Sequence, residues 1–282
     1  MFSLNAQHAL ATFQYGLVNS MGFWHYCFGW RKLNIRPGDL VLEVGPGQKP
    51  MIRSDVLVDK FLTDDTERGG GLVIDRPLIV ADVCALPFKD KVFDYAYTAH
   101  TLEHIEDIEQ ALSELQRVAK RGCIIVPHWH WEGLWNYPFH LWLISAREGK
   151  IIFRRKCRLF ELDETELRGR TKDLVWHLIS RNLEAFEVRY EWDGKIDYEI
   201  VRCGCEDFRP KRKASIERVA RKSLPLRAQI KRWARIAVTR FLRWWWAKTG
   251  QLNTKAVMRP RDDRTTGPRD TVKRRNGEAE RR

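Results

Sequence analysis

Five short runs of mainly aliphatic or aromatic residues recur between residues 40 and 128, and they restrict the possible folds more than any other feature of the chain. In order they are LVLEVG, DVLVDKF, PLIVADV, FDYAYTAH and GCIIVPH. Nearly continuous apolar runs are typical of parallel strands that are buried on both faces. Between the last two runs, apolar residues recur at helical spacing in EDIEQALSELQRVAKRG. Strand, helix and strand in this order predict a right-handed crossover in a doubly wound, mostly parallel α/β sheet.

The pattern changes after residue 128, where about forty residues precede the next regular segment. This is too long for an ordinary connection. We therefore expect residues 129–165 to form a lid insert on the substrate side, with a hairpin over KIIFRRKCRLFEL, and a helix near 173–182 to follow it. Two alternating segments around Asp193-Gly194 predict an antiparallel hairpin over 183–203. The expected fold is a Rossmann-like, seven-stranded sheet with this antiparallel terminal hairpin.

Charge is distributed unevenly along the chain. The formal net charge is +13, yet residues 1–208 carry a net −5, residues 209–248 a net +13 and residues 249–282 a net +5. The basic character therefore belongs to a C-terminal attachment. The expected organisation is an aromatic-rich helical cap (1–36), a main domain (37–208), a basic amphipathic helical segment (209–250) and a disordered tail (251–282).

Nothing in the composition favours secretion or a membrane span. The six cysteines are scattered and lack the spacing of a disulfide framework or of paired metal knuckles. The start of the chain lacks the features of a signal peptide, and no window approaches the roughly 20 apolar residues of a spanning helix. We expect reduced thiols and a cytoplasmic protein.

The segment VLEVGPGQKP ends the first predicted strand in glycines. Gly45 and Gly47 allow the backbone to approach a nucleotide closely. No Gly-Lys-Ser/Thr follows, which disfavours binding of a nucleoside triphosphate. A dinucleotide site is disfavoured as well, because the third glycine of its motif is missing and Pro50 stands where its helix should run. The ligand that remains compatible with this segment is a nucleoside without a pyrophosphate. Asp59, at the end of the second strand, can accept hydrogen bonds from ribose hydroxyls, and Asp82, at the end of the third, can accept one from an adenine amino group.

Four segments occur in a specific order between residues 38 and 128: VLEVGPG, VLVDKF, ADVCALPF and FDYAYTAHTLEHIED. In these segments the chain resembles class I S-adenosylmethionine-dependent methyltransferases of the branch that modifies small molecules and glycan or lipid intermediates. The resemblance implies S-adenosyl-L-methionine as cofactor. It assigns Glu43, Gly45 and Gly47 to the methionine and ribose side, Asp59 to the ribose diol, Asp82 with the backbone of Val83 to adenine, and His100 to a place beside the cofactor. The hairpin over 183–203 fits the reversed last strand of this family.

The connection between the first two strands departs from the family pattern. Only Pro46 to Ser54 separate them, whereas a parallel crossover normally needs a dozen residues or more. We expect the helix after the glycine loop to be nearly absent.

The segment PHWHWEGLWNYPFH (127–140) begins at the carboxyl end of the fifth predicted strand, beside the expected cofactor crevice. Such a position suits an acceptor pocket. Methyl transfer depends on holding the acceptor close and aligned, with a base when the acceptor is a hydroxyl. His128, His130 and His140 are therefore the candidate catalytic residues, and ordinary polar packing in a lid is the alternative for each.

The same segment allows two other interpretations. In an extended chain His128, His130 and Glu132 would point to one side, as metal ligands could. Spacing alone does not show that these side chains converge on one point, so we assign no metal site. The three tryptophans of the segment and the nearby Trp142 suit a sugar ring or an apolar acceptor, or else the core of the insert: Trp129, Trp131, Trp135 and Trp142. We expect His104, in LEHIED, to orient its loop.

The C-terminal segment LPLRAQIKRWARIAVTRFLRWWWAKTG predicts a basic amphipathic helix over about 225–247. One stripe contains Leu226, Ile230, Trp233, Ala237, Phe241 and Trp244 or Trp245. Positive charge on the flanks and the opposite face comes from Lys231, Arg232, Arg235, Arg240, Arg243 and Lys248. Tryptophan and basic residues favour an anionic membrane surface. The alternatives are binding to nucleic acid and packing against the body of the protein.

Together these features predict a cytoplasmic methyltransferase, peripheral on the inner face of a bacterial membrane. We expect a small-molecule or glycan acceptor, and specifically O-methylation of a saccharide or lipid-linked glycan intermediate. The alternative is an RNA-binding or RNA-modifying protein that uses the same fold with a basic tail.

Overall fold

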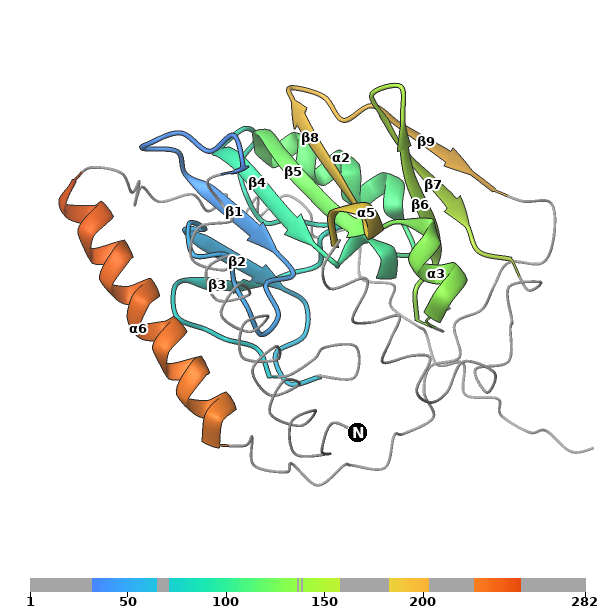
Figure 1. Ribbon diagram of the computed structural model, residues 1–282. Coiled ribbons are helices and arrows are strands. Elements are labelled where there is room, and N and C mark those ends of the chain that lie inside the picture. Colours follow the sequence, from blue (N-terminus) through green and yellow to red (C-terminus); the bar gives the residue numbers. More distant parts are fainter. Residues whose placement is uncertain are drawn as a thin grey trace, which may run out of the picture.

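A six-stranded sheet with the order β3-β2-β1-β4-β5-β8 forms the centre of the computed structural model (Figure 1). The structure describes residues 32–64, 71–135, 137, 139–157, 183–202 and 226–249. The first five strands are parallel, and β8 is antiparallel to β5. Their bounds are β1 Val41–Val44, β2 Val56–Asp59, β3 Leu78–Val80, β4 Phe93–Ala99, β5 Ala119–Pro127 and β8 Glu187–Asp193. The predicted α/β fold with a mostly parallel, Rossmann-like sheet is confirmed.

Three predicted segments cannot be compared with this fold. The helical cap up to residue 31, the helix near 173–182 and the tail over 251–282 lie outside the described residues.

The strand order reverses between β1 and β4, which lie side by side and are both parallel to their outer neighbours. In open α/β sheets, ligands bind beyond the carboxyl ends of the strands at such a switch point. The carboxyl ends of β1, β2, β4 and β5 are therefore the edge at which a site is expected.

Helix α2 (Ile108–Val118) connects β4 to β5 and covers one face of the sheet (Figure 1). Its N-terminus is capped by Asp107, whose side chain accepts a hydrogen bond from the backbone N–H of Gln110 at 3.1 Å. The predicted apolar stripe is confirmed, because five side chains are at most 1% exposed: Ile108, Ala111, Leu112, Leu115 and Val118. Burial of each of the larger aliphatic side chains stabilises the fold by about 1.5–3 kcal/mol.

The predicted terminal hairpin is wrong. β8 pairs with β5, whereas β9 (Tyr198–Val201) pairs in parallel with β7 in a second sheet of the order β6-β7-β9. Gly194 has the positive φ of a turn, yet only an isolated bridge joins Asp193 to Lys195. Ile196, buried and held by a hydrogen bond from its N–H to the side chain of Gln116, directs the chain away from β8. The main sheet therefore has six strands within the described residues.

The described part of the insert comprises α3 (Trp129–Trp135), β6 (Trp142–Arg147) and β7 (Lys150–Arg155). β6 and β7 form a hairpin around Glu148-Gly149, both with positive φ. The hairpin predicted over 150–162 is thus displaced, because β7 is the second strand of the pair and its other edge is taken by β9. Trp142 fixes the insert to the body by packing in the main core and donating a hydrogen bond to the carbonyl of Ile105 at 2.7 Å.

Helix α6 (Leu226–Lys248) lies along the edge of the sheet next to β2 and β3 (Figure 1). It contacts the connection between β1 and β2, where the guanidinium of Arg243 donates to the carbonyl of Ser54 and lies 3.5 Å from the carboxylate of Asp55. No helix in the described ranges is long and apolar enough to cross a membrane.

Candidate active site

The glycine loop leaves β1 in a conformation that only glycine adopts easily. Gly45 has a φ of +71°, and its N–H donates to the carbonyl of Val58 at 2.9 Å. A Cβ at this position would lie 2.1 Å from Oγ1 of Thr101. Gly47 also has positive φ, but a Cβ there would have no neighbour within 4 Å. The loop is therefore packed tightly at Gly45 and open at Gly47, where a ligand can approach its backbone.

Glu43 supports this loop from within the protein. Its side chain is buried, and its carboxylate accepts hydrogen bonds from the N–H of Met51 and from Oγ of Ser54. Burial raises its pKa to about 7. Residues 45–55 contain no helix, as predicted from the short connection. The carboxylate of Glu43 thus fixes a helix-free connection, and its assignment to the cofactor itself stays a prediction.

Two carboxylates lie at the ends of neighbouring strands. Asp59 is the last residue of β2, and its Oδ1 accepts a hydrogen bond from the N–H of Phe61 at 2.9 Å. Asp82 follows β3 and accepts hydrogen bonds from Lys60 Nζ at 2.7 Å and from the N–H of Cys84 at 2.9 Å. Burial opposes ionisation of Asp82, but the contacts with Lys60 and Cys84 outweigh it and lower the pKa.

These features fit a nucleoside cofactor. Acceptor oxygens at the ends of β2 and β3 can receive hydrogen bonds from hydroxyl and amino groups, and the loop at Gly47 is open. The side chain of Val83 is buried in the core, which leaves only its backbone for contact with a ligand. The roles of Gly45, Gly47, Asp59, Asp82 and Val83 in binding remain predictions.

His100 follows β4 and also has a positive φ, of 51°. Its imidazole is half exposed and lies 3.0 Å from the carboxylate of Glu187, at the start of β8, and 3.6 Å from that of Glu103. Burial would lower the pKa of His100, but the neighbouring carboxylates of Glu103 and Glu187 raise it to about 10. His100 is thus a cation at the carboxyl edge of the sheet.

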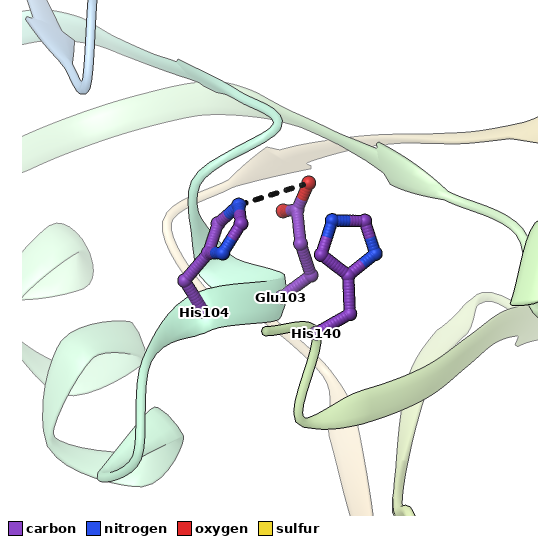
Figure 2. Close-up of side chains that lie close together, drawn as sticks. All are labelled: Glu103, His104 and His140. Carbon is purple, nitrogen blue, oxygen red and sulfur yellow. Dashed lines mark ion pairs between the residues drawn. The ribbon is translucent and has the colours of Figure 1, made fainter. Parts of the chain in front are cut away.

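Next to His100, the short helix η2 (Leu102–His104) and the loop before β6 bring together Glu103, His104 and His140 (Figure 2). Glu103 is 1% exposed. Each of the three residues offers one ligand atom, and these atoms lie within 4.8 Å of one another. Sequence reasoning missed this cluster, because His140 is distant in sequence and Glu103 was considered only as part of a family segment. The signal available was the pair Glu103-His104 directly after a strand end.

The three candidate catalytic histidines have different surroundings. His128 and His130 lie next to one another at the start of α3, with ring centroids 4.3 Å apart. His140 is buried and its Nδ1 hydrogen-bonds to the carboxylate of Glu132, which also pairs with Lys156. The expectation that His128, His130 and Glu132 share one side of an extended chain is wrong, because residues 129–135 are helical. The catalytic roles stay predictions.

The tryptophans in and next to the segment also differ in their surroundings. Trp129 is 47% exposed beside His130, whereas Trp142 is buried in the main core. Trp142 therefore has the structural role that the sequence left open. The side chain of Trp135 lies outside the described residues.

Comparison with known proteins shows similarity to methyltransferases. Residues 58–126 match a family described as a methyltransferase domain. The ubiquinone/menaquinone biosynthesis C-methyltransferase UbiE of Bordetella avium is 32% identical over 106 residues, which cover 32% of this chain and 41% of that protein. The botryococcene C-methyltransferase of Botryococcus braunii is 29% identical over 119 residues, 37% of this chain and 31% of that protein.

Among solved structures, the YcgJ protein of Bacillus subtilis has a TM-score of 0.30 and 22% identity, over 37% of this chain and 51% of that chain. The chain spans less than half the length of the two curated relatives above. The match supports the resemblance to class I S-adenosylmethionine-dependent methyltransferases that the sequence motifs indicated. The match implies S-adenosyl-L-methionine as the cofactor.

Proposed function

We infer that this protein transfers a methyl group from S-adenosyl-L-methionine to a lipid-borne acceptor at an anionic membrane surface. The observation that carries the first part is the carboxyl edge of the sheet, with an open backbone at Gly47 and the carboxylates of Asp59 and Asp82 at neighbouring strand ends. When bound, S-adenosyl-L-methionine supplies an electrophilic methyl group on its sulfonium. The protein then has to hold the acceptor in line and to remove a proton where the acceptor carries one.

His128 is the best-suited proton acceptor among the three candidate histidines. Burial and the neighbouring His130 lower its pKa, so its imidazole is neutral at physiological pH. A neutral imidazole can accept a proton. His100, in contrast, is cationic and can stabilise negative charge that develops on an acceptor next to Glu187.

The lipid-borne acceptor is supported by two observations. The names of several relatives refer to ubiquinone or menaquinone, botryococcene, sterol and squalene, all of which are lipophilic. These names favour a carbon acceptor over the hydroxyl of a lipid-linked glycan that the sequence predicts. A lipophilic acceptor reaches an enzyme through a membrane surface, and helix α6 carries the features of such a contact.

Helix α6 turns its aromatic stripe outward within the described part of the chain. The exposed fractions are 68% for Trp233, 60% for Phe241 and 55% for Trp244. The body is contacted instead by a face that contains Thr239, which is fully buried, and Arg243. The helix is therefore docked on the protein, as one alternative predicted, yet its apolar stripe does not form the docking face. Indole rings beside basic residues suit the headgroup region of an anionic bilayer.

Two measurements test this function. Calorimetric titration with S-adenosyl-L-methionine should give saturable binding, and absence of binding at millimolar cofactor would refute the methyltransferase proposal. Transfer of radiolabelled methyl groups into membrane lipid, polysaccharide and RNA fractions should label lipid. Label confined to RNA would support the RNA-modifying alternative and exclude a lipid-borne acceptor.

The membrane contact has its own test. Full-length protein should sediment with vesicles that contain phosphatidylglycerol, and replacement of Trp233, Phe241 and Trp244 by alanine should abolish sedimentation. Trp129→Ala, which removes an exposed indole outside α6, is the matched control and should sediment like the wild type. Tight binding of single-stranded RNA without vesicle binding would assign the helix to nucleic acid.

A further inference from the structure

Glu103 presents an unusual combination of burial and missing hydrogen bonds. Its side chain is 1% exposed, and neither carboxylate oxygen has a hydrogen-bond partner in the structure. The nitrogens nearest to it in ion pairs are Nδ1 of His100 at 3.6 Å and Nε2 of His104 at 3.9 Å. A buried carboxylate without hydrogen bonds is strongly unfavourable unless a charged partner compensates it. Glu103 therefore has charged neighbours at ion-pair distance but no hydrogen-bond donor, which leaves its carboxylate oxygens available to a further ligand.

The residues around this carboxylate are metal-binding types. Figure 2 shows the imidazoles of His104 and His140 on either side of Glu103, with the carboxylate pointing between them. The ligand atoms of the three residues lie within 4.8 Å of one another. Ligands at the usual 2.0–2.2 Å from a tetrahedral ion are roughly 3.4 Å apart, so small side-chain rotations suffice to enclose an ion.

His140 is oriented in the way that metal-bound histidines usually are. Its Nδ1 is hydrogen-bonded to the carboxylate of Glu132, which leaves Nε2 as the nitrogen that can ligate. Glu132 is itself fixed by Lys156, which is fully buried. A carboxylate that holds the second nitrogen of a ligating histidine fixes both the tautomer and the direction of the ring. This support is independent of the unpartnered carboxylate of Glu103.

We propose that Glu103, His104 and His140 form a site for one divalent transition-metal ion. Two imidazoles and one carboxylate favour Zn²⁺, Mn²⁺, Fe²⁺ or Co²⁺ over the oxygen-loving Mg²⁺ and Ca²⁺. Three protein ligands leave at least one position for water or for an oxygen of a ligand. The site adjoins the glycine loop, because Thr101, two residues before Glu103, is the residue that a Cβ at Gly45 would strike. Metal binding is a property separate from the proposed methyl transfer.

The test uses full-length protein freed of metal with a chelator and then titrated with Zn²⁺, and with Co²⁺ as a spectroscopic probe. The wild type should bind one equivalent of Zn²⁺ and develop the visible absorption of protein-bound Co²⁺. Glu103→Gln and His140→Gln should weaken Zn²⁺ binding by at least 100-fold. His130→Gln is the matched control, because His130 and His128 form the other histidine pair of this region, and it should leave Zn²⁺ affinity unchanged.

Thermal unfolding separates a metal site from a merely structural cluster. Zn²⁺ should raise the Tm of the wild type and leave that of Glu103→Gln unchanged. A wild type that binds no Zn²⁺ or Co²⁺, or a Glu103→Gln variant that binds Zn²⁺ as tightly, would overturn the proposal. Titration of the same samples with S-adenosyl-L-methionine tests methyltransferase function separately, so failure of the metal site can be distinguished from failure of the proposed function.

Discussion

Replacement of Glu43 by glutamine should make the stability of the protein less dependent on pH. The carboxylate of Glu43 lies in the interior and accepts hydrogen bonds from the N–H of Met51 and from Oγ of Ser54. A glutamine of the same shape can accept from Met51 through its carbonyl oxygen and donate to Ser54 Oγ through its amide. The substitution therefore removes the ionisable group and keeps the connection between β1 and β2 satisfied.

The magnitude follows from the pKa. Burial raises the pKa of Glu43 from 4.5 to about 7, so between these values the folded protein holds a proton that the unfolded chain has lost. The stabilisation is fully present below pH 4.5 and is lost as the pH rises through 7. A shift of this size corresponds to on the order of 3 kcal/mol at 1.36 kcal/mol per pKa unit. Above pH 8 Glu43→Gln should be more stable than the wild type by up to that amount, and near pH 4.5 the two should be similar.

Urea denaturation between pH 4.5 and 8.5 measures this difference directly. Asp55 also has a pKa raised mainly by burial, but it is present in both proteins and cancels in the comparison. Glu148→Gln serves as control, since Glu148 is exposed on the β6–β7 turn and its substitution should leave the curve parallel to that of the wild type. A constant offset between wild type and Glu43→Gln across the range would refute the reasoning.

Three further outcomes are expected. In urea denaturation, Gly45→Ala should destabilise the protein by roughly 2–5 kcal/mol, because the strain of a left-handed backbone adds to a clash with Thr101. Gly47→Ala meets no neighbour and should destabilise it by only about 1 kcal/mol. Equal effects of the two substitutions would contradict the packing described for the loop. Asp59→Ala should weaken cofactor binding in calorimetry by about 1–3 kcal/mol in a folded protein, and unchanged affinity would remove Asp59 from the site. The rate of methyl transfer should persist below pH 6.5 because the pKa of His128 is lowered, and His128→Gln should slow transfer without changing cofactor affinity; an unaffected rate would exclude His128 as the base.

The sequence was most informative where one local rule determined the structure. Apolar runs such as those around Val44 and Val58 predicted parallel buried strands, and the short segment from Pro46 to Ser54 predicted the missing helix, because neither depends on distant partners. The terminal hairpin failed for the opposite reason. Asp193-Gly194 is a favourable turn, but the pairing of β9 was decided by the free edge of β7 and by the anchoring of Ile196.

The same distinction between local rules and distant contacts applies to the candidate site. The positions of Asp59 and Asp82 were predictable because the carboxyl ends of consecutive parallel strands meet at one edge, and their roles in binding stay predictions. The contact between Glu103 and His140 was not predictable, because it depends on how the insert packs on η2, and no periodicity records such a contact. The backbone conformation also misled the interpretation of residues 128–132, since a helix begins where an extended chain was assumed.

The histidine- and tryptophan-rich segment 127–140 has two parts with different surroundings. Its first residues, around His128 and Trp129, are accessible at the end of β5, where an acceptor would lie. Its later part forms a buried network in which Glu132 links His140 to Lys156. Paired buried charges add little to stability compared with apolar side chains of similar size, so stability alone does not explain such a network. What the network does provide is a fixed direction for the His140 ring, which faces Glu103 at the carboxyl edge of the sheet.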